Sequence, residues 1–322
     1  MEQIHTKLSE KIIIRAAKLT FTLEALESGN ISFFPASVFR GMIAREIRKA
    51  SCIFPDIACE QCSFIKTCAY GTMFEPTAEQ FAPDFADRMK NISPPLIIET
   101  PFFPEGRWEK GNKIKLKVIF LGDTVERAFY IYEALQLIGQ QFGVGSDRIK
   151  FKVVKIEEVV PHRGTKELSF EDLISDRLSP QLYSWKKPEN EINRLLIDVE
   201  TPLRIQNKGN IMREFSLQPF IYAVFRRVNY LAKLYGQEIY LPRQDEIDDL
   251  LKNVNLIRPN LIWQDFRRYS GKQKKEMNLG GLTGNFRLDG NLSTLYPYLK
   301  AASEFHVGKQ TVFGLGSFTV WE

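Results

Sequence analysis

The chain lacks any long apolar run. None of its segments approaches the roughly 20 consecutive apolar residues that cross a bilayer, although hydrophobic residues make up 44% of the 322 residues. The first seven residues, from Met1 to Lys7, also lack the apolar region of a secretory signal peptide. We therefore expect a soluble, cytoplasmic protein without a membrane partner, long enough for one large domain or two of ordinary size.

Cysteine is rare and confined to one segment. The four cysteines are Cys52, Cys59, Cys62 and Cys68, and none occurs elsewhere. Disulfides are rare in the cytoplasm, whereas four thiolates can close a tetrahedral zinc site around a close pair such as Cys59-x-x-Cys62. The cluster favours structural zinc, with an iron–sulfur cluster or metal-free reduced thiols as alternatives. A closed four-thiolate site has no open position for catalysis, so such a metal would only hold the segment together.

Histidine is equally scarce, which narrows the choice of proton-transferring side chains. The chain has three histidines, His5, His162 and His306, and histidine is the side chain whose pKa lies nearest neutrality. His5 is near a terminus and His162 is in a polar segment, whereas His306 stands beside Gly308 and Lys309. His306 is therefore the best-placed candidate for a general acid or base. The competing interpretations are an imidazole that caps the preceding helix or bonds to backbone, and direct contact with the ligand without catalysis.

The excess of positive charge is small. Lys and Arg number 44 against 39 Asp and Glu, for a net charge of +5, so the distribution of the charge matters more than its sum. Two clusters are candidates for binding a polyanion, although each is also compatible with a solvated surface. One lies along the helix predicted at 37–50 and the other surrounds Gly271. Their candidate residues are Arg40, Arg45, Arg267, Arg268, Lys272, Lys274 and Lys275.

The hydrophobic pattern predicts the same order of elements twice. In the first half, strands are expected at 11–23, 95–100, 113–121 and 149–160, and helices at 37–50 and from the N-cap Thr124 onward. In the second half, strands are expected at 194–205 and from Ser317, a hairpin at 261–288, and helices at 216–235 and 292–303. Each half thus reads βαββαβ. The sequence predicts an α+β protein of two tandem ferredoxin-like domains, 1–162 and 193–322, with a linker at 163–192 and a Cys-rich insertion at 51–90.

The last seventeen residues carry a glycine-rich motif. They run from His306 to Glu322, with Gly308, Gly314 and Gly316 around Lys309. Because glycine has no Cβ, we expect these glycines to let the backbone of a ligand approach closely, and a lysine between them suits a phosphate. The first half has an echo of the motif in Gly143-Val-Gly145. Residues 200–215, from Glu-Thr-Pro-Leu-Arg to Phe215, form a second distinctive stretch.

On these residues the chain resembles the CRISPR-associated RAMP endoribonucleases, which cut precursor CRISPR RNA within its repeats. The C-terminal signature of that family is Gly-Φ-Gly-x5-Gly-Φ-Gly, where Φ is apolar. The chain matches it at Val307, Gly308, Gly314, Leu315 and Gly316 and has His306 in place of the first glycine. The resemblance also covers Leu195 to Phe225 and the cysteine cluster, since similar clusters occur in part of the family.

The resemblance implies two tandem ferredoxin-like domains and an RNA substrate. It implies that the 2′-hydroxyl of the RNA attacks the adjacent phosphate without a catalytic cofactor or metal ion, leaving a 2′,3′-cyclic phosphate and a 5′-hydroxyl. Many relatives place a catalytic His or Tyr near the first helix, but this chain has neither between His5 and Tyr70. Lys309, Arg40 and Arg45 can instead supply the positive charge for a slow, single-turnover cleavage.

Two other functions compete with the endoribonuclease. The chain can be a non-catalytic RAMP subunit that holds guide RNA in a CRISPR effector complex, which the missing first-helix histidine favours. An RRM-like RNA-binding protein would carry aromatic strands with a Lys/Arg-Gly-Phe spacing, which the sequence does not have. In either RAMP interpretation the expected partners are CRISPR repeat RNA and other CRISPR-associated proteins, with the chain a monomer or homodimer.

Overall fold

The computed structural model describes residues 8–81, 92–175, 178–265, 267–270 and 275–322. It divides into two compact units, which we call the N-terminal unit (Arg15–Gln181) and the C-terminal unit (Met1–Ile14 with Leu182–Glu322). Their boundary falls inside the first strand, so Met1–Ile14 is grouped with the C-terminal unit rather than with the first predicted domain. Among the described residues, no helix is both long and apolar enough to cross a membrane.

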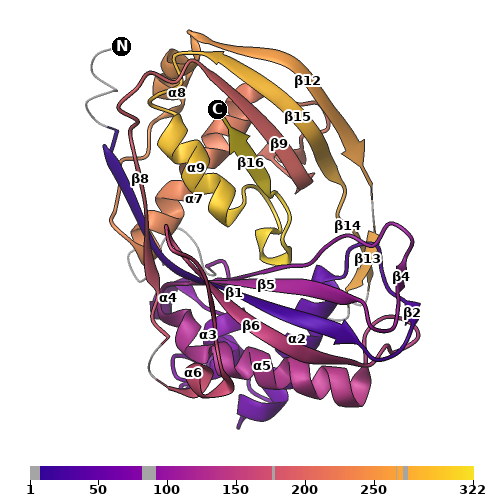
Figure 1. Cartoon of the computed structure of the whole chain (residues 1–322). Coiled ribbons are helices and arrows are strands. Elements are labelled where there is room, and N and C mark those ends of the chain that lie inside the picture. Colours follow the sequence, from indigo (N-terminus) through magenta and orange to yellow (C-terminus); the bar gives the residue numbers. More distant parts are fainter. Residues whose placement is uncertain (1–7, 82–91, 176–177, 266, 271–274) are drawn as a thin grey trace. The chain divides into compact units, whose positions relative to one another are not determined.

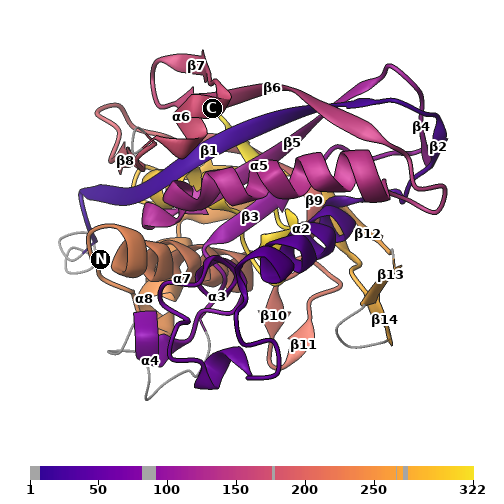
Figure 2. The ribbon, with the colours of Figure 1, turned by 90° about the horizontal axis from the view of Figure 1, so that it is seen from below.

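The N-terminal unit is a ferredoxin-like fold built around one antiparallel sheet. The sheet has the order β3-β5-β1-β6-β7, with Phe21 of β1 opposite both Leu116 of β5 and Ile156 of β6. Helices α2 and α5 lie against the sheet (Figure 2), and Phe39 and Ile131 of these helices belong to its hydrophobic core. The elements of the βαββαβ set are β1 (Lys11–Ala25), α2 (Ala36–Ser51), β3 (Leu96–Glu99), β5 (Lys113–Leu121), α5 (Ala128–Leu137) and β6 (Phe151–Val160).

The N-terminal unit has several shorter elements in addition to this βαββαβ set. The predicted insertion carries η1, α3 and α4, and a small ladder joins β2 to β4. Thr124 does not begin a helix: it lies in the 3₁₀ segment η3, and α5 starts only at Ala128 after N-cap Arg127. The bounds are β2 (Gly29–Asn30), η1 (Cys59–Gln61), α3 (Ala69–Phe74), α4 (Ala78–Phe81), β4 (Arg107–Trp108), η3 (Gly122–Arg127) and η4 (Ile138–Phe142).

The segment predicted as a linker, 163–192, is largely folded. It contains β7 (Gly164–Glu167), α6 (Phe170–Ile174) and β8 (Gln181–Lys186), and β7 extends the sheet of the N-terminal unit beside β6. Its polar composition misled the prediction because every residue of β7 is exposed at the sheet edge. The capping box at Ser169 and Asp172 starts α6.

The C-terminal unit repeats the ferredoxin-like topology. Its antiparallel sheet has the order β12-β15-β9-β16, and Figure 1 shows α7 and α9 on one face of it. Alternate residues of β9, Leu195, Ile197 and Val199, are buried toward these helices. The set is β9 (Arg194–Leu203), α7 (Leu217–Tyr235), β12 (Val254–Gln264), β15 (Gly281–Gly290), α9 (Tyr296–Phe305) and β16 (Phe318–Trp321).

Three additions to this set escaped the sequence prediction or extended it. The predicted hairpin is confirmed and continues past the sheet as β13 (Arg267–Ser270) paired with β14 (Lys275–Asn278). A small hairpin, β10 (Gln206–Asn207) with β11 (Asn210–Ile211), follows β9. Helix α8 (Gln244–Leu251) lies between α7 and β12.

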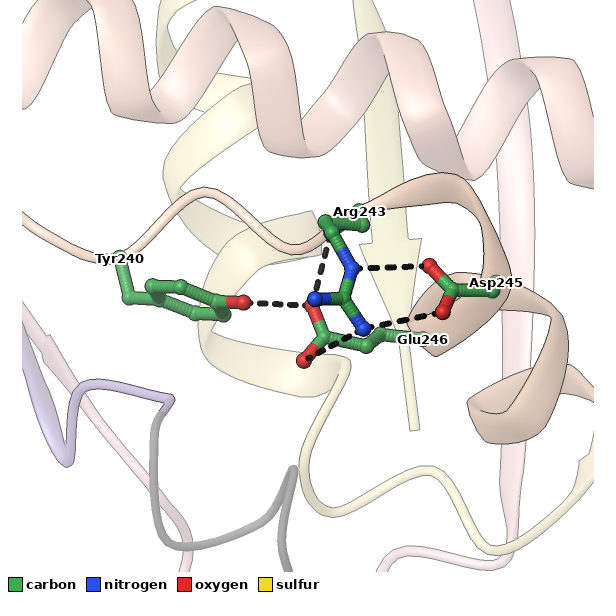
Figure 3. Close-up of polar contacts among 4 residues, drawn as sticks. All are labelled: Tyr240, Arg243, Asp245 and Glu246. Atoms are coloured by element: carbon green, nitrogen blue, oxygen red, sulfur yellow. Dashed lines mark hydrogen bonds and ion pairs between the residues drawn. The ribbon is translucent and has the colours of Figure 1, made fainter.

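A compact polar cluster fixes the start of α8. The Glu246 side chain, 8% exposed, accepts hydrogen bonds from the Tyr240 hydroxyl (2.5 Å) and from the backbone N–H of Arg243 (2.9 Å). Figure 3 shows the Arg243 guanidinium beside the same carboxylate and paired through two nitrogens with Asp245, at 3.1 and 3.0 Å. Glu246 therefore satisfies backbone and side-chain donors at once, which is how a helix N-terminus is stabilised.

Candidate nucleic-acid interface

The glycine-rich loop connects α9 to β16 in the C-terminal unit. It contains a short 3₁₀ turn, η5 (Thr311–Phe313). Five of its residues have positive φ: His306 (60°), Gly308 (100°), Gln310 (65°), Gly314 (76°) and Gly316 (75°). The loop is thus a run of left-handed turns, a conformation that favours glycine over other residues.

Close contacts with the protein's own backbone explain why two of these positions are glycine. A Cβ on Gly308 would lie 2.6 Å from the carbonyl oxygen of Arg204, and one on Gly316 would lie 1.9 Å from that of Val307. Because both contacts are with backbone that has little freedom to move, these glycines are required for the loop to fold. The expectation that they make room for a ligand is corrected accordingly for these two positions.

Backbone bonds tie the loop to the end of β9. The N–H of Lys309 donates to the carbonyl of Arg204 (2.9 Å), and that of Gly316 donates to Pro202 (3.1 Å). The Thr201 hydroxyl donates to the carbonyl of Gly314 (2.8 Å) and accepts from the N–H of Ser317 (2.8 Å). The Thr-Pro-Leu-Arg stretch of the sequence is therefore the platform on which the loop rests.

His306, the predicted candidate for a general acid or base, lies in the interior of the unit. The residue is 2% exposed, and its Nδ1 lies 3.2 Å from the carbonyl oxygen of Leu315. The backbone carbonyl of His306 accepts from Nε of Arg227 at 3.1 Å. The interpretation of His306 as a helix-terminating, hydrogen-bonded residue fits these contacts, and an imidazole in contact with substrate does not.

Arg227 also holds the end of α9. Besides His306 it bonds the carbonyl of Phe305 through Nε (3.3 Å) and Nη2 (3.0 Å). Burial lowers the pKa of Arg227 to about 10, which leaves the guanidinium charged at neutral pH. A cation at the C-terminus of a helix satisfies the last carbonyls and complements the helix dipole. Arg227 therefore supports the loop, whereas its neighbour Arg226 is exposed.

Positive and aromatic side chains surround the platform. Lys309 is exposed at the loop tip and Lys208 is exposed in the β10–β11 turn. The Arg213 guanidinium stacks over the ring of Trp263, 4.8 Å from the centroid. Arg204 bonds the carbonyl of Gly280, and burial lowers the pKa of Arg204. Cations next to an aromatic ring are among the elements of a surface for single-stranded nucleic acid.

The hairpin β13–β14, which carries predicted basic residues, lies at the end of the C-terminal sheet that is next to Arg204. Leu282 of β15 pairs with Leu203 of β9, next to Arg204, and β13 and β14 continue from β12 and β15 at this end. The predicted residues Arg267, Arg268 and Lys275 are therefore carried by a ladder that extends from the platform. Lys272 and Lys274 lie outside the described residues.

Arg40 and Arg45 of the N-terminal unit lie on α2 but not on one face of it. The Arg40 guanidinium is 5.2 Å from the centroid of Phe74, in the insertion. The Arg45 guanidinium is 5.1 Å from the centroid of Phe142, the last residue of η4, and its Nε donates to Glu46 at 2.6 Å. The two arginines therefore contact different segments of the N-terminal unit.

The four cysteines are free thiols of intermediate exposure. Burial first, and then the charge of Glu75, raise the pKa of Cys59, with Cys68 and Cys52 near enough to add to the effect. Within the described ranges, however, no three His, Cys, Asp or Glu side chains are arranged to hold a metal ion. The thiols gather in one region without forming the closed zinc site, so zinc stays a prediction.

Sequence comparisons divide the chain as the fold does. Residues 14–180 match the family AF_1859_N, described as an N-terminal domain, and residues 197–318 match the CRISPR-associated endoribonuclease Cas6 family. Among curated proteins, none matches the chain at a significant level.

Solved structures share the fold at low identity. A chain of a partial Cas6-RT-Cas1–Cas2 complex is 12% identical with a TM-score of 0.56, over 96% of this chain and 46% of that chain. A Cas6 product complex is 14% identical with a TM-score of 0.53, over 95% and 100%. Thermus thermophilus Cas6 is 12% identical with a TM-score of 0.52, over 96% and 99%. The chain spans 46% and 29% of the first two chains it matches.

Two ferredoxin-like units in tandem, with a glycine-rich loop before the last strand, define a protein of the RAMP type. The family matches in both units agree with this architecture, and together they leave few residues uncovered. The model AF_1859_N matches more than half of the chain, so the chain belongs to that family. Residues 197–318 match the CRISPR-associated endoribonuclease Cas6 family, and the chain shares the fold of solved Cas6 structures.

Proposed function

We propose that this protein is an endoribonuclease that cuts precursor CRISPR RNA within its repeats to release guide RNAs. The observation that carries the proposal is the exposed Lys309, presented by a rigid loop in the part of the chain that matches the Cas6 endoribonuclease family. The partners are then CRISPR repeat RNA and other CRISPR-associated proteins, as in the complex that contains a Cas6 chain.

The proposed reaction needs no metal ion, because RNA carries its own nucleophile. The 2′-oxygen attacks the adjacent phosphorus in line while its proton is removed, and the bond from phosphorus to the 5′-oxygen breaks as that oxygen gains a proton. The products are a 2′,3′-cyclic phosphate and a 5′-hydroxyl. The protein must align the attack and stabilise the extra negative charge on the phosphate.

Lys309 is the residue we assign to that charge. Its backbone is fixed by the bond to Arg204, so the exposed side chain starts from a defined place on the loop, and its flexible stem lets the ammonium group reach a nearby phosphate. A cation next to the scissile phosphate stabilises the negative charge that develops there. Arg204 is positioned beside it by the parallel bridge to Gly308. His306 does not enter this assignment because its ring is enclosed by the loop.

The competing function is a subunit that holds guide RNA without cutting it. The burial of His306 favours it, because that histidine is 2% exposed and its ring is bonded to the Leu315 carbonyl within the loop. A surface with cations but without an accessible imidazole binds RNA well and moves protons poorly.

Incubation of excess protein with end-labelled repeat RNA in EDTA separates the two functions. We expect one cut per repeat, a 2′,3′-cyclic phosphate on the upstream product, and a rate lowered at least about tenfold by Lys309→Ala, since a single electrostatic contact to the transition state has this scale or more. Lys252→Ala, at the C-terminus of α8, is the matched control. Tight binding with no cleavage would establish the guide-holding subunit instead.

A further inference from the structure

The N-terminal unit contains an open cleft that the proposed cleavage does not use. Its volume is about 920 Å³, within the range of ligand-binding sites. Three segments line it: the 27–32 turn, helix α2 and the 141–150 loop, all of them inside Arg15–Gln181. The cleft is therefore defined by one compact unit alone.

The ring of Phe142 and the side chain of Arg45 line the cleft, and Lys49 lies next to them. Phe142 is partly exposed, and the guanidinium carbon of Arg45 and Nζ of Lys49 lie over its ring, 5.1 and 5.3 Å from the centroid. Both cations also contact the buried carboxylate of Glu46, Arg45 at 2.6 Å and Lys49 at 3.3 Å. Glu46 holds the two side chains in place while half or more of each stays exposed. A ring flanked by held cations is a surface on which a nucleobase stacks.

The charges further along the 141–150 segment favour an anion. Arg148 is exposed, and Nζ of Lys150 donates to the carbonyl of Gln141 at 2.6 Å. The carboxylate of Asp147 accepts from the N–H and the side-chain amide of Asn30, both at 2.9 Å, and these bonds lower the pKa of Asp147. The exposed carboxylate of Glu27 also lines the cleft, so the charged lining consists of Arg45, Arg148 and Lys150 against Glu27 and Asp147. The cations are in excess, and Asp147 is already bound by donors of the cleft itself.

The walls are preformed rather than loose. A Cβ on Gly143 would lie 1.9 Å from the carbonyl oxygen of Arg148, and one on Gly145 would lie 2.1 Å from that of Asn30. Val144 and Ile149 exchange two backbone hydrogen bonds, at 3.0 and 2.9 Å, across the loop. A site that needs little ordering keeps more of its contact energy for the ligand.

We propose that this cleft binds one or two nucleotides of single-stranded RNA, with a base stacked on Phe142 and a phosphate at Arg148 and Lys150. The choice of RNA rests on the proposed function, because the family acts on RNA. The site is built by residues of the N-terminal unit alone and supplies affinity for an unpaired segment rather than chemistry. It is sequence-tolerant, because any base offers a face for stacking.

The test uses full-length protein and a fluorescent, unpaired oligoribonucleotide with the repeat sequence on one side of the cut. Phe142→Leu removes the ring and Phe142→Tyr keeps it. We expect the Kd to rise about 5- to 100-fold in the first, the scale of one lost base stack, and to stay within about twofold in the second. Equal losses in both variants, with unchanged thermal unfolding, would overturn the stacking role.

A charge reversal tests the phosphate contact independently. Arg148→Glu should weaken binding at least about tenfold and reduce the slope of log K against log salt by about 1. Arg163→Glu, the same change at an exposed position beyond the far end of β6, is the matched control and should leave both unchanged. Equal effects of the two reversals would show general electrostatics and no site.

Cross-linking separates this proposal from the enzymatic one. RNA with 4-thiouridine should cross-link to the peptide that contains Phe142, and the yield should drop in Phe142→Leu. Cleavage with no such cross-link overturns the cleft and leaves the endoribonuclease standing. A cross-link that competes with unlabelled RNA, in a protein that never cuts, keeps the cleft and overturns the endoribonuclease.

Discussion

His306 shows how one residue can depart from a family pattern and keep its geometry. It occupies the position where the RAMP signature has its first glycine, and its backbone has φ 60° and ψ 153°. This region is populated almost only by glycine and costs another residue about 1–3 kcal/mol. The buried imidazole bonded to Leu315 offsets that cost. We interpret the histidine as a structural replacement for glycine.

Substitution of His306 tests this interpretation directly. Alanine usually exceeds glycine in stability by about 1 kcal/mol within a helix, and this order should hold at Ser303 of α9. At His306 we expect the reverse, with His306→Gly more stable than His306→Ala, because glycine relieves the positive φ. Both should be less stable than the wild type by about 1–3 kcal/mol, since the buried Leu315 carbonyl loses a partner.

Denaturant unfolding measures these differences, and cleavage by the folded variants completes the test. If folded His306→Ala loses roughly 10²-fold or more in cleavage rate while binding RNA normally, the imidazole acts as an acid or base after all. A rate within a few fold of the wild type assigns the residue to the fold.

At the scale of elements, the cluster at the start of α8 gives a pH dependence. The hydrogen bond to Glu246 raises the pKa of Tyr240 above its ordinary value near 10. A group whose pKa is raised by folding contributes stability that is complete below its unfolded pKa and is lost as the pH rises through its folded value. We expect the unfolding free energy of the wild type to fall more steeply above pH 10 than that of Tyr240→Phe.

Unfolding in urea at several values between pH 8 and 11 provides the measurement. Other tyrosines with raised pKa, such as Tyr296 and Tyr298 (each about 12), are common to both proteins, so the difference between the two curves isolates Tyr240. Parallel curves would show that the bond drawn in Figure 3 does not persist in solution.

The cysteine-bearing insertion makes a separate prediction about metal. We expect about one zinc ion per chain in protein purified without chelator, lost when Cys59 and Cys62 are both replaced by serine and kept in the control Ser63→Ala. A four-thiolate site contributes folding energy to the segment that holds it. Elemental analysis with thiol titration decides: four freely titratable thiols and no metal would contradict the prediction.

At the scale of the whole molecule, binding of RNA should depend steeply on salt. Each phosphate contact releases counterions, so log K falls linearly with log salt. We expect Lys309→Glu to weaken binding of repeat RNA and reduce the slope by about 1, while Lys252→Glu leaves both unchanged. An unchanged slope for Lys309→Glu would place the loop tip outside the RNA path. Filter binding between 50 and 300 mM salt provides the measurement.

The two glycine pairs show the duplication of the fold in physical terms. Gly143 and Gly145 have φ of 72° and 81°, and Gly314 and Gly316 have 76° and 75°. Each pair lies between the second helix of its unit and the last strand, where the chain must turn sharply. The predicted echo therefore reflects the same turn in two ferredoxin-like units.

The sequence by itself determined the elements and their order, because apolar periodicity reports which face of a helix or strand is buried. Strand β5 coincides with its prediction at 113–121, and the predicted order of strands and helices holds in both units. It also determined the RAMP resemblance, since the glycines mark turns that other residues fit poorly.

Only the tertiary structure decided which side chains face solvent. The sequence gives no sign that His306 turns inward, because that depends on Leu315 and on Arg227, which is distant along the chain. The cleft at Phe142 could not be predicted from the sequence either, because its walls come from three separate segments, 27–32, α2 and 141–150. The burial of a side chain and its neighbours in space depend on contacts between residues that are distant in the sequence, so the local sequence pattern does not predict them.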